Sequence, residues 1–273
     1  MILDKPKINI IISDTHCGSD RGVFPPQISL PPLMADENER LLKYTYNQEK
    51  LYNHLMLCAD HINIQYKNHQ KVFIHNGDAI EGLHHRNVQL SAPMESDHVE
   101  IHKAVMEAFL IRAGFSIMNG DELYYGSGTE AHTGYFEARI ARYFEPYGAK
   151  YFDELKLKQF GNDIWFVHQW KGAGDGTNEG NSVSNGLKAM YYNSLKEGWK
   201  MPRVVIGSHY HKATMGSWSQ NWQTFYGMIT PSFQMKTRFG QKVSAFQRND
   251  IGVGLIEVAA DGLLAIREPL LMK

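Results

Sequence analysis

Short runs of aliphatic, β-branched or aromatic residues recur along the chain, and each is followed by polar residues that include aspartate or histidine. The runs cover residues 8–12, 72–74, 123–125, 164–167 and 204–206. Runs of this length, bounded by glycine or polar residues, predict buried strands. Ligands gather beyond the carboxyl ends of strands in α/β sheets, so the sequence predicts a site where these polar clusters meet.

Apolar residues at helical spacing occupy the segments between the runs. We expect helices over 37–66, over 97–118, directly after Gly134, and over 182–197 with Ser182 as the N-cap. Strands that alternate with helices predict an α/β fold with right-handed crossovers.

The pattern changes after residue 212, where aromatic residues suggest short strands. Further strands are expected over 252–258 and 263–266, joined by a hairpin turn at 259–262. We interpret this part as a second sheet packed on the first. It is not expected to be a separate domain, because no linker precedes it. Residues 1–273 are therefore expected to form a single domain.

Two segments are expected to be loops beside the site. Residues 18–36 contain proline pairs at 25–26 and 31–32, which exclude regular structure over much of that length. Residues 171–181 hold four glycines and follow closely on the fourth apolar run. Loops placed in this way often act as lids or contact the substrate.

Composition limits which classes of protein and which partners the sequence is compatible with. Hydrophobic residues make up 43% and aromatic residues 12% of the 273 positions, as in a folded globular protein. A net charge of −1 provides no general attraction to nucleic acid or membranes and argues against a processive nuclease. Cys17 and Cys58 are too few for a disulfide framework, and neither a signal peptide nor a membrane-spanning run is recognisable. We expect a cytoplasmic protein in which Cys17 is a packing residue.

Histidines and aspartates are concentrated at the predicted strand ends. Asp14 and His16 are two residues apart, so in an extended chain their side chains point the same way and can bind one cation. His209 and His211 repeat this spacing, and Asp78 follows the second run. Mixed carboxylate and imidazole ligands without thiolates suit Mn, Fe or Zn better than Ca or Mg.

The order of these motifs resembles that of the calcineurin-like metallophosphoesterases. Asp-x-His, Gly-Asp, a glycine-flanked cluster, a strand-end histidine and Gly-x-His-x-His follow one another from Asp14 to His211. The Gly-Thr-Glu-Ala-His cluster and the later Thr230-Pro231 resemble a phage or prophage branch, for which the compartment would be the host cytoplasm. The resemblance implies a four-layer αββα sandwich of two mixed sheets packed face to face and flanked by helices.

The resemblance also implies a role for each matching residue in a centre of two divalent ions, with Mn favoured and Fe or Zn as alternatives. Asp14, His16 and His211 would hold the first ion, Asp78 would bridge both ions as a catalytic residue, and His168 and His209 would hold the second. A hydroxide that bridges two such metals can attack phosphorus in line.

The sequence departs from the family at the fourth motif. Thr129 stands where the family has a metal-binding asparagine, and Glu130 stands where it has a catalytic histidine. A hydroxyl is a poorer ligand than an amide oxygen, so Thr129, Glu130 or neither would complete the second metal site. His132 lies two residues further on and is our candidate for the acid that protonates the leaving group.

Residues after Asp78 are expected to support the site. Glu81 is a candidate for orienting a metal ligand. His84, His85 and Arg86 are candidates for contact with the substrate phosphate, with a role as ordinary loop residues as the alternative. Glu130 is a candidate for contact with the substrate, and its alternative, shared with Thr129, is to cap the N-terminus of the helix expected after Gly134.

The expected function is hydrolysis of a phosphate ester. A phosphodiester or nucleotide is favoured over a monoester by analogy with phage-type relatives, and nucleic acid is then a candidate partner. One alternative is a degenerate metallophosphoesterase fold that serves as a binding or scaffold module, motivated by the altered fourth motif. Another is a mononuclear or structural metal protein. Metal content and turnover would distinguish the three.

Overall fold

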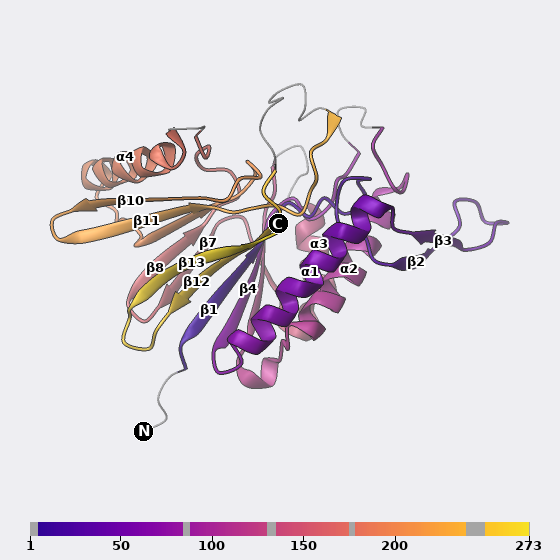
Figure 1. Ribbon diagram of the computed structural model, residues 1–273, viewed down its shortest axis with the longest axis horizontal. Helices are drawn as coiled ribbons and strands as arrows, with labels where there is room; N and C mark the ends of the chain where they lie inside the picture. The colour runs from indigo at the N-terminus through magenta and orange to yellow at the C-terminus, as the bar shows by residue number, and fades with distance from the viewer. Residues whose placement is uncertain (1–4, 84–87, 130–134, 175–177, 239–248, 273) are drawn as a thin grey trace.

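A computed structural model describes residues 5–83, 88–129, 135–174, 178–238 and 249–272. Its strands form two mixed sheets and a small two-stranded sheet. In the six-stranded sheet the order is β13-β12-β1-β4-β5-β6. Its strands β13, β12, β1 and β4 lie side by side in Figure 1. The strands β1, β4, β5 and β6 are parallel, whereas β12 is antiparallel to β1 and to β13. Their bounds are Lys7–Ile12 for β1, Gln70–Asn76 for β4, Glu122–Gly126 for β5, Lys150–Phe152 for β6, Gly252–Val258 for β12 and Leu264–Leu271 for β13.

The five-stranded sheet has the order β10-β11-β9-β8-β7. Here β8, β9 and β11 run parallel, and the edge strands β7 and β10 are antiparallel to their neighbours. The bounds are Leu155–Gln159 for β7, Asn162–Phe166 for β8, Val204–Gly207 for β9, Thr214–Gln220 for β10 and Gln223–Ile229 for β11.

The two sheets pack face to face over a shared apolar core. Ile11 and Ile74 from the first sheet and Phe166, Ile206 and Met228 from the second are among its buried members. One polar pair crosses this core, where the buried amides of Asn9 and Gln159 exchange hydrogen bonds of 2.9 and 2.8 Å. Each amide thereby satisfies the other, which removes the cost of burying them unpaired.

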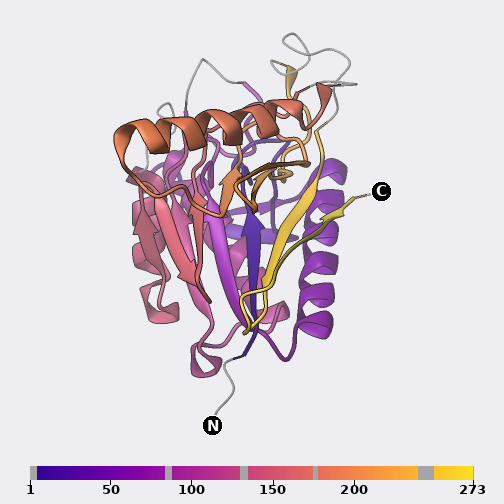
Figure 2. The same ribbon diagram turned by 90° about the vertical axis from the view of Figure 1, so that its left-hand side faces the viewer.

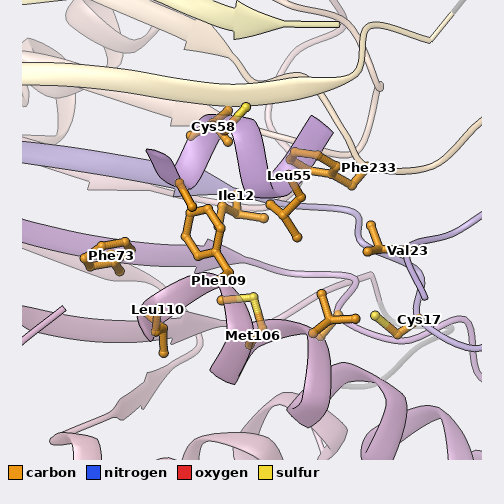
Figure 3. Packing of buried hydrophobic residues seen from close by; sticks show 14 of the residues in the cluster. Ile12, Cys17, Val23, Leu55, Cys58, Phe73, Met106, Phe109, Leu110 and Phe233 are labelled. Carbon is orange, nitrogen blue, oxygen red and sulfur yellow. The ribbon is translucent and has the colours of Figure 1, made fainter. Parts of the chain in front are cut away.

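Helices cover both outer faces, which completes the four-layer αββα sandwich (Figures 1 and 2). The helices α1 (Tyr46–Gln65), α2 (Glu95–Arg112) and α3 (Tyr135–Tyr143) lie on the six-stranded sheet, and α4 (Asn181–Glu197) lies on the five-stranded sheet. Leu55 of α1, Phe109 of α2 and Phe73 of β4 belong to the core between these helices and the sheet (Figure 3). The α/β fold class and the layer order expected from the sequence are confirmed.

Two predicted helix boundaries are wrong for identifiable reasons. Residues 37–66 do not form one helix, because Thr45 and Gln48 form a capping box that starts α1 at Tyr46. Residues 97–118 do not form one helix either, since α2 ends at Arg112 and Gly114 follows with a φ of 68°.

Ser182 is not the cap of α4. Gly180 occupies the N-cap position with a φ of 83°, and Ser182 lies inside the first turn. A residue in this left-handed conformation is most often glycine, since a Cβ atom would be strained there.

The strands after residue 212 do not form a sheet of their own. β10 and β11 extend the five-stranded sheet, whereas β12 and β13 return to the six-stranded sheet beside β1. The expected hairpin turn is present, since Gly262 donates to the carbonyl of Ala259 over 2.8 Å. The last strand is longer than expected and includes Pro269, which the edge position of β13 tolerates.

The segment 18–36 is not a simple loop. Residues Gln27–Leu30 form strand β2, which pairs with β3 (Arg40–Lys43) in a two-stranded sheet that projects from the body (Figure 1). The proline pairs flank β2 on both sides, so they bound the strand. Arg40 anchors this hairpin by two hydrogen bonds of 2.9 Å to the buried carboxylate of Asp97 on α2.

No helix among the described residues is long and apolar enough to cross a membrane.

Candidate metal centre

The turns that follow β1 and β4 are joined by backbone hydrogen bonds. Asp14 donates to the carbonyl of Gly77 over 3.0 Å, His16 to that of Asp78 over 3.1 Å, and Cys17 to that of Ala79 over 3.1 Å. This short ladder continues the parallel pairing of the two strands beyond their ends. It holds the two carboxylates and His16 at the same edge of the sheet.

Left-handed backbone conformations are concentrated at the predicted ligands. Eight described residues other than glycine have a positive φ, and five of them are Asp14 (51°), His16 (42°), Asp78 (51°), His209 (70°) and His211 (54°). Such conformations cost free energy and persist where the surrounding structure imposes them, often at functional sites.

The side chains of Asp14 and His16 do converge, but not by the route predicted from their spacing. Both residues have left-handed φ values, so the segment turns and is not extended. The expectation of an extended pair at this position is therefore wrong in its mechanism, although both side chains reach one cluster.

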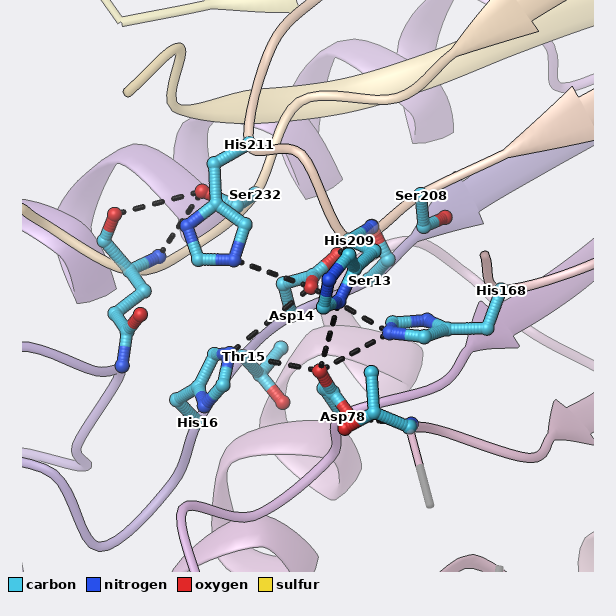
Figure 4. A network of polar contacts seen from close by, with 12 residues as sticks. Ser13, Asp14, Thr15, His16, Asp78, His168, Ser208, His209, His211 and Ser232 are labelled. Atoms are coloured by element: carbon cyan, nitrogen blue, oxygen red, sulfur yellow. Dashed lines mark hydrogen bonds and ion pairs between the residues drawn. The ribbon is translucent and has the colours of Figure 1, made fainter. Parts of the chain in front are cut away.

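One group of candidate ligands contains Asp14, His16 and His211. One ligand atom from each lies within 4.8 Å of the others. Oδ1 of Asp14 is 3.2 Å from Nε2 of His211 and 4.0 Å from Nε2 of His16 (Figure 4). The three residues come from the ends of β1 and β9, so each sheet contributes to the group.

A second group contains Asp14, Asp78, His168 and His209, whose ligand atoms also lie within 4.8 Å of one another. Oδ2 of Asp78 is 3.0 Å from Nε2 of His168 and 3.9 Å from Nδ1 of His209. The same oxygen is 3.9 Å from Nε2 of His16, which belongs to the first group. The groups are therefore adjacent, and the two carboxylates lie between them (Figure 4).

The remaining carboxylate oxygens are fixed by backbone donors. Oδ2 of Asp14 accepts the N–H of His209 over 3.2 Å, and Oδ1 of Asp78 accepts the N–H of Thr129 over 3.0 Å. Each carboxylate thus uses one oxygen to hold its orientation and presents the other to the histidines.

Two of the imidazole rings are oriented by acceptors on their far side. Nδ1 of His168 lies 2.6 Å from the carbonyl oxygen of Asn76, and Nδ1 of His16 lies 3.0 Å from Oε2 of Glu81. These oxygens only accept, so each Nδ1 carries the proton and Nε2 is left as the atom that faces the carboxylates. Metal-binding histidines are usually held in this way.

Buried ring nitrogens in the second group lack hydrogen bonds. Nε2 of His168 and Nδ1 of His209 have no hydrogen-bond partner in the described part of the chain, although Asp78 lies within ion-pair distance of both. A cation between these nitrogens and the carboxylates would satisfy them. The oxygen and nitrogen donors therefore fit divalent ions such as Mn, Fe or Zn.

The electrostatics of the carboxylates follow from their surroundings. Burial alone would raise the pKa of Asp14, but the facing imidazoles of His211 and His168 outweigh it and hold the pKa well below its usual range. Burial acts in the same direction on Asp78, where His168 makes the largest opposing contribution and the pKa is also lowered. Both residues are thus ionised and ready to bind a cation.

The imidazoles show the reciprocal effect. Burial would lower the pKa of His16, yet the hydrogen bond and charge of Glu81 raise it to about 9. Burial would likewise lower the pKa of His168, which the charges of Asp78 and Asp14 raise to about 9. Cation binding must displace these protons, because a ligating nitrogen has to be unprotonated.

Thr129 lies beside the centre, where it contacts the candidate ligand Asp78. Its hydroxyl donates to Oδ1 of Asp78 over 3.3 Å in addition to the backbone bond. Its role as a ligand stays a prediction. Five other candidates lie outside the described residues, namely His84, His85, Arg86, Glu130 and His132.

The expected contact of Glu81 with a candidate ligand is present, and Glu81 is itself held by Nε2 of Gln234 over 2.9 Å. Cys17 is fully buried in the apolar core, which raises the pKa of its thiol to about 12, as suits a packing residue.

Sequence reasoning missed the partner of His211. Nδ2 of Asn249 lies 2.9 Å from Nδ1 of His211 and donates to the carbonyl of Gln234 over 2.8 Å. Asn249 precedes β12 and shares no motif with the histidine, so no signal in the sequence joins the two.

Comparison with known proteins gives a weak likeness of overall structure. The sequence matches no known family model and no curated protein. An archaeal phosphodiesterase superposes with a TM-score of 0.43 at 8% identity, over 97% of this chain and 99% of the other. The NAD nucleotidase of Haemophilus influenzae superposes with a TM-score of 0.40 at 11% identity, over 97% of this chain and 49% of the other. The sulfate thiohydrolase SoxB of Thermus thermophilus gives 0.42 at 9% identity, over 97% and 57%.

Proposed function

We propose that the chain is a metal-dependent phosphoric ester hydrolase with two adjacent cation sites. The observation that carries this proposal is the pair of contiguous ligand groups, which share Asp14 and face Asp78 from both sides. Two cations held next to each other can bind both the attacking and the leaving oxygen of an in-line displacement at phosphorus.

The ligands divide between the two sites. Asp14, His16 and His211 would hold one ion, and Asp78, His168 and His209 would hold the other. Asp78 is the candidate bridge, because its Oδ2 lies near histidines of both groups. When bound, the ions would supply a water of lowered pKa and neutralise charge on the phosphoryl oxygens.

The chain's own residues would prepare the site for this chemistry. Asn76 and Glu81 keep the ring nitrogens of two ligands directed at the centre, and Thr129 fixes the free oxygen of Asp78. We further propose His132 as the acid for the leaving group and His84, His85, Arg86 and Glu130 as substrate contacts. Each of the five follows a strand that ends at the centre.

A phosphodiester or nucleotide is the substrate class we favour, with Mn as the metal. Asp and His ligands without thiolate suit Mn, Fe and Zn. The choice of a phosphodiester or nucleotide rests on the motif resemblance.

Metal content and turnover test the proposal together. Apo protein reloaded with Mn²⁺ would be analysed for metal and assayed with bis-p-nitrophenyl phosphate and p-nitrophenyl phosphate. Asp78→Asn should lose one ion and lower turnover by more than about 100-fold. Loss of a residue that only contacts a metal ligand typically costs up to that much, and Asp78 is proposed as a ligand itself. Asp121→Asn is the matched control, since that buried carboxylate accepts from the backbone of Lys71 and Ser116 at the opposite ends of the strands. Two ions with no turnover on either ester or on nucleotides would contradict hydrolysis.

A binding or scaffold module remains the second candidate. It is favoured by Thr129, whose hydroxyl donates to Asp78 where the resembled family supplies an amide ligand. This interpretation predicts one or no bound ion and no turnover on generic substrates, so the same experiment separates the two functions.

A further inference from the structure

A second polar cluster lies beneath the ligands and is fully enclosed by the protein. It contains Thr15 from the turn after β1, His75 from β4, His102 from α2 and Tyr125 from β5, each at most 1% exposed. Ring contacts tie it together, since His75 stacks on Tyr125 with centroids 5.5 Å apart and meets His102 edge-on at 4.9 Å. None of the four belongs to a ligand group.

The direction of each hydrogen bond in this cluster can be assigned from whether the atoms can donate or only accept. Nδ1 of His102 lies 3.1 Å from the carbonyl of Ala79, which only accepts, so this nitrogen carries the proton. Nε2 of His102 is then bare and accepts the hydroxyl of Tyr125 over 3.3 Å. The hydroxyl of Thr15 donates to Ala79 over 2.8 Å, which leaves its oxygen to accept from Nε2 of His75 at 3.1 Å.

These bonds converge on the peptide units of Ala79, the residue directly after Asp78. Its carbonyl accepts from Thr15, from Nδ1 of His102 and from the backbone of Cys17. Its N–H donates to Oε1 of Glu137 on α3 over 3.2 Å. Glu137 is fully buried and its other oxygen has no partner among the described residues.

The hydrogen bond from Thr15 to Ala79 joins the two turns that carry the left-handed ligands of the metal centre. Thr15 lies between Asp14 and His16, both left-handed, and Ala79 follows Asp78, which is also left-handed. A bond from Thr15 to Ala79 therefore ties the backbone of three candidate ligands together at a point that touches none of their side chains. Such conformations persist only where surrounding contacts impose them.

The imidazoles of the cluster are suited to this role because they stay neutral. Burial lowers the pKa of His75 to about 3 and holds the pKa of His102 well below its usual range. Neutral rings keep a fixed pattern of one donor and one acceptor, which the assigned bonds require.

We infer that Thr15, His75, His102 and Glu137 are positioning residues that clamp Ala79 and thereby preorganise the two turns that carry Asp14, His16 and Asp78. The inference rests on the proposed metal centre and deepens it. Cation affinity then depends on a network that never contacts the cation. Partners outside the ligands commonly change metal affinity by about 10–100-fold.

The test measures Mn²⁺ affinity by isothermal titration calorimetry on full-length protein. Thr15→Val removes the hydroxyl at nearly constant shape and should weaken Mn²⁺ binding about 10–100-fold. Thr15→Ser keeps the hydroxyl and should restore wild-type affinity. A purely structural role would instead lower the midpoint of unfolding in EDTA and leave the affinity of the folded protein unchanged.

His102→Phe extends the test to the helix, with His98→Phe as the matched control. His98 lies one turn earlier on α2 and is equally buried. Its Nε2 donates to the carbonyl of Ala92 over 2.9 Å, and among the described residues no hydrogen bond joins it to Ala79, so it is outside the clamp. We expect the His102 variant alone to lose affinity. Should Thr15→Val or His102→Phe fail to fold, Tyr125→Phe removes one hydroxyl, keeps the ring stack and should give a smaller loss.

The outcomes separate the two proposals. Wild-type protein that binds no Mn²⁺ would overturn the metal centre and the clamp with it. Wild-type protein that binds two ions, with unchanged affinity in every folded clamp variant, would overturn the clamp alone. Equal losses in the His98 and His102 variants would also overturn it, because the effect would then be one of general packing.

Discussion

The carboxylate of Glu81 lies 3.0 Å from Nδ1 of His16, on the side of the ring that faces away from the metal centre. Both residues are buried, and Gln234 holds the same carboxylate oxygen from behind. A chain of contacts thus runs from the segment after β11 through Glu81 to a candidate ligand. Carboxylate partners of this kind fix the ring and increase the basicity of the ligating nitrogen.

We therefore predict that Glu81→Gln weakens binding at the first ligand group. The amide keeps the shape of the side chain but removes the charge that favours His16 as a ligand. Mn²⁺ titrations should show one class of site weakened about 10-fold or more, with the other less affected. Glu39→Gln serves as a control, because Glu39 is an exposed residue that bonds to Ser29 on the projecting hairpin. Equal affinities in wild type and Glu81→Gln would show that the contact has no role in binding.

Gly77, the residue after β4, allows the backbone there to pack closely against His168 of the second ligand group. Its φ is 90°, and a Cβ atom there would lie 2.4 Å from Nδ1 of His168 and 2.6 Å from the carbonyl oxygen of Ser127. Gly77→Ala should therefore displace His168 and lower the number of bound ions from two to one.

Gly148→Ala is the control that distinguishes the steric clash with His168 from backbone strain alone. Gly148 is also left-handed, with a φ of 72°, but a Cβ atom there would meet nothing within 4 Å. We expect it to lower the free energy of unfolding by about 1–2 kcal/mol and to leave metal content at two. Gly77→Ala should cost more than this in denaturant unfolding. If both variants retain two ions, the requirement for glycine at position 77 is conformational only.

Much of the centre is predictable from the sequence because strand ends are local features. Apolar runs indicate the strands, and polar residues just beyond the strand ends, such as Asp14, Asp78 and His209, must lie at the carboxyl edge of the sheets. The ligand groups then follow from parallel pairing, which places the ends of neighbouring strands together.

Other features depend on contacts that no local pattern records. Asn249 reaches His211 and Gln159 reaches Asn9 from distant parts of the chain, and neither pair has a characteristic spacing. The return of β12 to the edge of β1 is equally hidden, because alternating apolar residues fit either sheet. The left-handed turns are hidden for a different reason. Glycine is the usual signal of a positive φ, whereas Asp14 and His16 adopt it only because surrounding contacts impose it.

The two ligand groups make distinct predictions for metal stoichiometry. His211 belongs only to the first group and His209 only to the second. Each of His211→Ala and His209→Ala should therefore leave one Mn²⁺ per chain, measured by mass spectrometry of the metal after gel filtration. His61→Ala, an exposed histidine on α1, should keep two.

The same variants should differ from wild type in stabilisation by metal. A ligand at 100 times its dissociation constant raises the free energy of unfolding by about 2.7 kcal/mol for each independent site. Wild type should therefore gain about twice as much as either variant from saturating Mn²⁺, and EDTA should remove the gain. Stabilisation of both variants by as much as wild type would argue against two separate sites.

Glu137 gives a prediction for the pH dependence of stability. Burial raises the pKa of its carboxyl to about 7 and the charge of Asp78 adds to this, against the lowering effect of the hydrogen bond from Ala79. The folded state thus holds a proton that the unfolded state releases near pH 4.5. Stability from this group is present below that pH and is lost as the pH rises to about 7, by roughly 3 kcal/mol in total.

Glu137→Gln stays neutral at every pH and should not show this loss. In EDTA, denaturant unfolding at pH 5 and pH 8 should find the variant more stable relative to wild type at pH 8 than at pH 5. Glu268→Gln is the control, since Glu268 is exposed on β13 and its replacement should give no such difference. A Glu137 variant whose stability relative to wild type is the same at both pH values would mean that the buried carboxyl ionises as readily in the folded chain as in the unfolded one.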